Sequence, residues 1–112
     1  MTDSPATGHR RYPRLGVKLP IRWRSSAGAE FRSALSKTIS TDGMCMGTDA
    51  RLEPGEQLDL RISLGDEQHP LQARAKVCWT SGEPPVMDIG LEFTEIADHD
   101  REVIDLLVRG TL

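Results

Sequence analysis

Apolar and polar residues alternate with a period of two along most of this 112-residue chain. Because successive side chains of a β-strand point to opposite faces, such alternation is typical of strands with one buried face. It predicts six strands, at residues 17–24, 31–39, 44–48, 58–64, 71–79 and 87–93. Short turns that contain glycine, proline or aspartate separate these segments, which favours antiparallel pairing between neighbours.

The apolar positions of these strands are the candidate core. Core packing is predicted for Trp23, Trp79, Met44 and Met46. One face of the second strand is predicted to consist of Phe31, Ser33, Leu35, Lys37 and Ile39. In the first strand, Pro20 has no N–H to donate. Its nitrogen should therefore face away from the partner strand or lie at a bulge.

After Phe93 the apolar period changes to a helical one. Asp98 is the predicted N-cap, and Gly110 is expected to end the helix. The sequence therefore predicts an all-β fold with one C-terminal helix that covers an open end or face. A six-stranded antiparallel β-barrel is favoured over a sandwich, because closure removes the exposed edges of an open sheet.

The length allows one domain with one core. Residues 1–8 are expected to form a flexible tail, and residues 9–112 a single domain. No apolar run approaches the roughly 18 residues of a membrane span, so membrane insertion is not expected. The N-terminus does not resemble an export signal, and two cysteines are too few for a disulfide framework. A cytoplasmic location is therefore expected, with Cys45 and Cys78 in or near the core.

Charge is distributed unevenly along the chain, whose net charge is −3. Residues 1–24 carry six basic residues against one acidic residue, whereas the remaining chain carries 8 basic and 16 acidic residues. A basic segment on an acidic body indicates a focused anion site. A DNA-binding or RNA-binding domain of this size would usually be basic overall, so neither nucleic acid is expected as a partner.

Strand pairing brings this basic segment to one particular turn. If the first hairpin turns near Ala27, antiparallel partners have residue numbers that sum to about 54. Arg14 then falls opposite Ser40, beside the turn Thr41-Asp42-Gly43. An arginine fork suits phosphate oxygens and the O6/N7 edge of guanine. A serine hydroxyl and a glycine that tolerates positive φ or close backbone approach would complement it.

Two short motifs resemble those of the PilZ domain family. Arg10-Arg11-Tyr12-Pro13-Arg14 is similar to its RxxxR motif, and Thr38-Ile39-Ser40-Thr41-Asp42-Gly43 is similar to its [D/N]xSxxG motif. The order of the motifs, the six strands, the segment Gly90-Leu91-Glu92-Phe93 and the final helix agree over residues 9–109. The resemblance implies a six-stranded PilZ-type barrel that binds cyclic di-GMP, without a further cofactor, and signals to a protein effector.

The ligand-binding residues implied by the resemblance fall into two groups. The primary candidates are Arg10, Arg14, Ser40 and Gly43, and the secondary candidates are Arg11, Thr38 and Asp42. Thr38 departs from the family pattern, because it replaces an Asp or Asn that can accept hydrogen bonds from guanine. One lost hydrogen bond costs on the order of 1–3 kcal/mol, roughly 5- to 150-fold in affinity. Asp42 or water can supply the missing acceptor.

Each residue also has a plainer interpretation. Arg10 and Arg14 can be solvated basic residues, and Ser40 and Gly43 can serve only as turn formers. The alternative function is therefore a degenerate PilZ-like module that binds a protein and no nucleotide. No catalytic constellation and no metal-ligand spacing occurs in the sequence, so neither an enzyme nor a metal site is expected.

Overall fold

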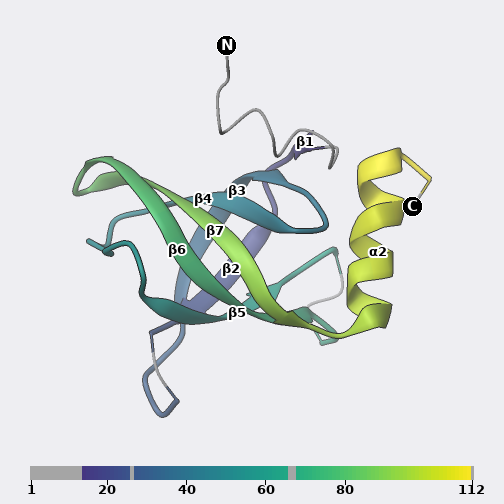
Figure 1. The fold of residues 1–112 in the computed structure, drawn as a ribbon, viewed down its shortest axis with the longest axis horizontal. Helices are drawn as coiled ribbons and strands as arrows, with labels where there is room; N and C mark the ends of the chain where they lie inside the picture. Colours follow the sequence, from purple (N-terminus) through teal and green to yellow (C-terminus); the bar gives the residue numbers. More distant parts are fainter. Residues whose placement is uncertain (1–13, 26, 66–67, 112) are drawn as a thin grey trace.

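Six antiparallel strands close into a barrel, and one helix packs beside it (Figure 1). The computed structural model describes residues 14–25, 27–65 and 68–111. Its elements are β1 (Leu15–Gly16), β2 (Pro20–Arg24), β3 (Arg32–Ile39), β4 (Gly43–Thr48), β5 (Gln57–Ile62), β6 (Leu71–Glu83), β7 (Val86–Ile96) and α2 (Asp98–Arg109). The predicted tail at residues 1–8 lies outside the described residues.

The ring closes because β3 pairs on both of its sides. The strand order is β1-β3-β2-β5-β6-β7-β4, and β3 also pairs with β4. Every pairing is antiparallel. The predicted six-stranded barrel is therefore confirmed, and the sandwich is not formed. The strands β6 and β7 are longer than predicted, because only Pro84 and Pro85 separate them.

Because apolar and polar residues alternate along the strands, the apolar side chains point into the barrel and form one continuous core. In β5, Leu58, Leu60 and Ile62 are buried, with more exposed residues between them. Met44 and Met46 are buried as predicted, and Trp23 is 3% exposed. Full burial of a large aliphatic side chain stabilises a fold by roughly 1.5–3 kcal/mol, so such positions dominate the choice of register.

The predicted inward face of β3 is wrong for most of the strand. Leu35 is 50% exposed, and the buried neighbour is Ser36 at 1%. The pairing with β4 shifts between Ser36 and Thr38, which leaves Lys37 as an extra residue. A bulge of this kind changes which residues face inward. For this reason Ile39 returns to the core with an exposed fraction of 0%.

The first predicted strand, at residues 17–24, forms only from Pro20 onward as β2, and the short strand β1 precedes it. Ser36 holds the segment between β1 and β2. Its hydroxyl oxygen accepts a hydrogen bond from the Leu19 amide at 2.8 Å, and the hydroxyl donates to the Val17 carbonyl. These bonds add to two backbone hydrogen bonds where the chain passes from β1 to β2: the Val17 amide donates to the Lys37 carbonyl at 3.1 Å, and the Ser36 amide donates to the Leu19 carbonyl at 3.0 Å. Pro20 then begins β2, where a missing N–H is tolerated.

The closing helix α2 stands beside the barrel in Figure 1 and covers part of its core. Ile104 is fully buried, and Val103, Leu107 and Val108 pack against the core cluster. The N-cap is Ala97, not Asp98 as predicted, and no side chain caps the helix. Asp98 instead lies in the first turn, where a carboxylate suits the positive end of the helix dipole. Gly110 ends the helix in a left-handed conformation, as predicted.

Among the described residues, no helix has the length and apolar character needed to cross a membrane.

The substitution Ser36→Ala tests the joint between β1 and β2. It removes the partner of the Leu19 amide and of the Val17 carbonyl. We expect a loss of about 1–3 kcal/mol in the free energy of unfolding, measured by urea denaturation. Ser33→Ala is the matched control, because Ser33 is exposed on the same strand. Equal effects of the two substitutions would contradict the role assigned to Ser36.

Candidate functional site

Strand β1 places Arg14 beside the turn that follows β3. Leu15 pairs with Ile39 and Gly16 pairs with Thr38, which is the predicted register. Arg14 immediately precedes this pairing and is exposed. Arg10 and Arg11, the other basic candidates, lie outside the described residues. Of the basic candidates, the structure therefore positions Arg14.

Ser40 holds the turn together from the inside. Its amide donates to the Gly43 carbonyl at 2.9 Å, and its hydroxyl hydrogen-bonds to the Asp42 carboxylate. The hydroxyl also lies 3.3 Å from the Gly43 carbonyl oxygen. Ser40 is only 1% exposed. The side chain that was a candidate ligand contact is thus engaged within the turn, and it presents Asp42 toward the surface.

Gly43 is needed for a different reason than the sequence indicated. Its φ lies outside the positive region, and it is the first residue of β4. A Cβ atom built on Gly43 would lie 2.1 Å from the Leu91 carbonyl oxygen of β7. The glycine therefore permits close packing of two backbones, and the Asp42 carbonyl on the same turn accepts a hydrogen bond from the Phe93 amide at 2.9 Å.

A pocket of about 220 Å³ opens next to this turn. Its lining residues come from the segment before β1, the turn, and strands β4, β6 and β7: Arg14, Asp42, Gly43, Met44, Cys45, Cys78, Trp79, Gly90, Leu91 and Glu92. The pocket thus brings together Arg14 from one motif and Asp42 and Gly43 from the other. Ser40 and Thr38 are not among the described residues that line the pocket.

Trp79 is the site residue that sequence reasoning missed. It was predicted in the core, but it is 47% exposed. The pairing of β6 with β7 shifts between Val77 and Trp79, so Cys78 is an extra residue and Trp79 turns outward. The indole lies against Gly90, where a Cβ atom would come within 2.1 Å of Nε1. A glycine within a strand is the one signal of such close approach in the sequence.

The pocket combines one cation with two carboxylates and two neutral thiols. Arg14 faces the same space as Asp42 and Glu92. Burial raises the pKa of the Cys45 thiol above its ordinary value. Burial, followed by the nearby Glu92 carboxylate, also raises the pKa of the Cys78 thiol. Cys78 is exposed and not in the core as expected, because it is the extra residue of the β6 bulge. At neutral pH neither thiol is ionised, so neither is a reactive nucleophile.

The helix is attached to the same turn. Arg101 of α2 donates from Nη1 to the Thr41 carbonyl at 2.9 Å. The turn is therefore held by β7 on one side, through the Phe93 amide, and by α2 on the other. A displacement of Thr41 or Asp42 would act directly on both elements.

The substitution Gly43→Ala tests the packing beneath the turn. The added methyl group would meet the backbone carbonyl of Leu91, which cannot rotate away. We expect a loss of about 1–3 kcal/mol in the free energy of unfolding, measured by urea denaturation. Gly16→Ala is the control, because its added Cβ atom would meet nothing closer than 3.9 Å. A Gly43→Ala protein as stable as the control would refute this account of Gly43.

Comparisons with known proteins identify the same architecture. The family model for the PilZ domain matches residues 8–110. The Bacillus subtilis inhibitor of motility (MotI/DgrA) is 25% identical, with a TM-score of 0.77 over 91% of this chain and 50% of that chain. This chain therefore spans half the length of the Bacillus protein.

Two further structures share the fold at lower sequence identity. The PilZ domain of Escherichia coli YcgR with c-di-GMP has a TM-score of 0.70 at 13% identity, over 92% of this chain and 91% of that chain. A tetrameric PilZ domain protein from Xanthomonas campestris has a TM-score of 0.72 at 10% identity, over 96% of this chain and 93% of that chain. No curated protein matches the chain. Because the family model covers nearly its whole length, this chain belongs to the PilZ domain family.

Proposed function

We propose that this protein is a receptor for cyclic di-GMP in the bacterial cytoplasm. The observation that carries the proposal is the pocket in which Arg14, Asp42 and the exposed indole of Trp79 meet. Arg14 of the first motif and Asp42 and Gly43 of the second line this pocket, and the β1–β3 register brings the two segments together. Two structural neighbours, both YcgR structures from Escherichia coli, contain c-di-GMP, which supports the same ligand class here.

Each of the three side chains offers chemistry that a guanine nucleotide can use. The Arg14 guanidinium can form paired hydrogen bonds with phosphate oxygens or with guanine O6 and N7. The Asp42 carboxylate can accept from the N–H groups of guanine. The indole of Trp79 offers a flat surface on which a base can stack. A dinucleotide carries phosphates and two bases, so it satisfies all three groups together.

The other candidate residues, Arg10, Arg11, Ser40 and Gly43, are assigned supporting roles, because the pocket alone is small for a dinucleotide. The pocket of about 220 Å³ is smaller than the roughly 300–1,000 Å³ typical of sites for drug-sized ligands. We propose that Arg10 and Arg11 supply further cationic contacts to the ligand. Ser40 and Gly43 act by holding the turn in shape.

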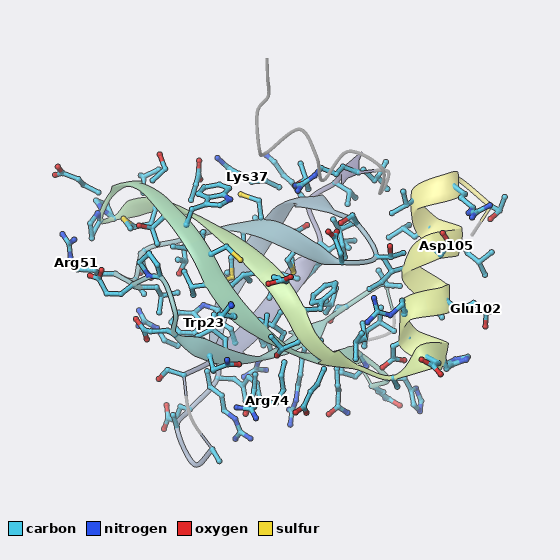
Figure 2. All side chains as sticks on the ribbon, viewed as in Figure 1. Trp23, Lys37, Arg51, Arg74, Glu102 and Asp105 are labelled. Atoms are coloured by element: carbon cyan, nitrogen blue, oxygen red, sulfur yellow. The ribbon has the colours of Figure 1, made fainter. Side chains whose placement is uncertain are left out.

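We further propose that occupancy is relayed to a protein effector, whose identity stays open. The hydrogen bond from Arg101 to the Thr41 carbonyl connects the turn to α2, whose Glu102 is exposed (Figure 2). A ligand that shifts the turn would therefore shift the contacts of the helix. No catalytic step is part of this proposal, and no cofactor is required.

Isothermal titration of the full chain with cyclic di-GMP tests the proposal. At about 100 μM protein we expect saturable binding in the micromolar range or tighter. Arg14→Ala and Trp79→Ala should each weaken binding by roughly 5- to 150-fold, the equivalent of about 1–3 kcal/mol for a bidentate or stacking contact. Trp79→Phe should retain most of the affinity, because it keeps an aromatic face. Absence of heat with folded protein would refute the receptor function.

The second candidate is a PilZ-like module that binds a protein and no nucleotide. The observation that favours it is Thr38, which replaces the family acceptor and does not line the pocket. A thermal shift separates the two candidates, since a ligand at about 100 times its dissociation constant adds roughly 2.7 kcal/mol of stability.

Thr38→Asn tests whether the lost acceptor limits binding. If it does, the substitution should raise the affinity for cyclic di-GMP by roughly 5- to 150-fold in the same titration. Thr38→Val, which keeps the shape and adds no acceptor, is the matched control. An unchanged affinity for Thr38→Asn would mean that Asp42 or water already supplies the acceptor.

A further inference from the structure

A second concave surface lies on the outside of β2, β3 and β5, and it shares no residue with the pocket at Arg14. Its volume is about 990 Å³. We call it the basic groove and define it by three cations, two apolar side chains and three polar side chains: Lys18, Arg22, Arg61, Pro20, Leu35, Ser33, Ser63 and Gln72. Lys37 and Asp49 also line it, and the Asp49 carboxylate is ion-paired with Arg32.

The cations of the basic groove have no acidic partner within the described part of the chain. Arg22 and Arg61 lie directly opposite each other on β2 and β5. Like charges at such a position destabilise a sheet unless another interaction offsets their repulsion. No described carboxylate forms an ion pair with Lys18, Arg22 or Arg61.

Basic residues next to these three cations, unlike them, form ion pairs with carboxylates. Arg24 and Arg74 both contact the Asp59 carboxylate: Arg24 Nε lies 2.9 Å from Oδ2, and Arg74 Nε lies 3.1 Å from Oδ1. Lys37, which borders the groove, lies 2.7 Å from Asp88. Unsatisfied positive charge is therefore concentrated at Lys18, Arg22 and Arg61.

Two features prepare the groove for a specific occupant. The Arg61 guanidinium lies 4.2 Å from the centre of the Phe31 ring, and that of Arg24 lies 4.6 Å from it. This contact holds Arg61 in place before a partner arrives. Leu35 is 50% exposed in the same groove and offers an apolar contact next to the cations.

We propose that the basic groove docks an extended acidic segment of a partner protein. Carboxylates of the segment lie on Arg22 and Arg61, and an apolar side chain lies on Leu35 and Pro20. The volume exceeds what a single small anion fills. A nucleic acid is disfavoured, because the chain has a net charge of −3 and lacks the uniformly basic surface of such proteins. The proposal does not rest on nucleotide binding.

The probe is a fluorescein-labelled peptide of about ten residues in all, with two leucines at its centre and Asp or Glu at every other position. An extended chain of that length spans about 33 Å at ~3.3 Å per residue, comparable with the 33 Å width of the protein. Fluorescence polarisation with the full chain, without nucleotide, should show saturable binding that weakens as salt is added. A peptide with lysine in place of the acidic residues should not bind.

The variant Arg22→Gln/Arg61→Gln should weaken binding of the acidic peptide about tenfold or more. Arg51→Gln is the control. It removes an exposed positive charge that does not line the groove. It should change affinity less than about twofold. Because the double variant removes like-charge repulsion, its melting temperature should equal or exceed that of the wild type.

Amide NMR shifts of the wild-type protein provide a measurement that does not depend on any variant. Addition of the acidic peptide should shift resonances of β2, β3 and β5 around the groove. The proposal is overturned if the peptide does not bind, if the double variant binds as well as the wild type, or if the shifts cluster elsewhere. Tighter binding of an oligothymidylate of equal charge would overturn it in favour of a nucleic acid.

Discussion

The pairing of β3 on both of its sides is the constraint on which the molecule depends. One side of β3 carries β1 and β2, and the other carries β4, so this strand closes the ring. Its C-terminal end pairs with β1, which fixes where Arg14 lies, and then leads into the turn that presents Asp42. The same strand therefore closes the core and aligns the two motifs of the candidate site.

Two bulges shape the two candidate functional surfaces of this barrel. The extra residue Lys37 in β3 turns Leu35 outward into the basic groove and directs Ser36 inward to hold β1 and β2. The extra residue Cys78 in β6 turns Trp79 outward over Gly90 and into the pocket at Arg14. In both cases one added residue moves an apolar side chain from the expected core to the surface, where it can contact a ligand or partner.

The turn at Ser40–Gly43 links the pocket to the rest of the fold. Hydrogen bonds connect it to Phe93 of β7 and to Arg101 of α2. The basic groove lies on other strands and has its own charges, so two ligands could occupy the protein together. Under the two proposals, recognition of a small molecule and docking of a partner use separate surfaces of the barrel.

The sequence by itself determined the strand count, the closing helix, the core methionines and the meeting of Arg14 with the turn. These features follow from local periodicity and from the fixed geometry of an antiparallel hairpin, so neighbouring residues suffice to predict them. Only the tertiary structure decided the exposure of Leu35 and Trp79, the burial of Ser36 and the reason for Gly43. Bulges depend on the register between strands far apart in sequence, and close backbone contacts such as that between Gly43 and Leu91 exist only once the barrel is closed.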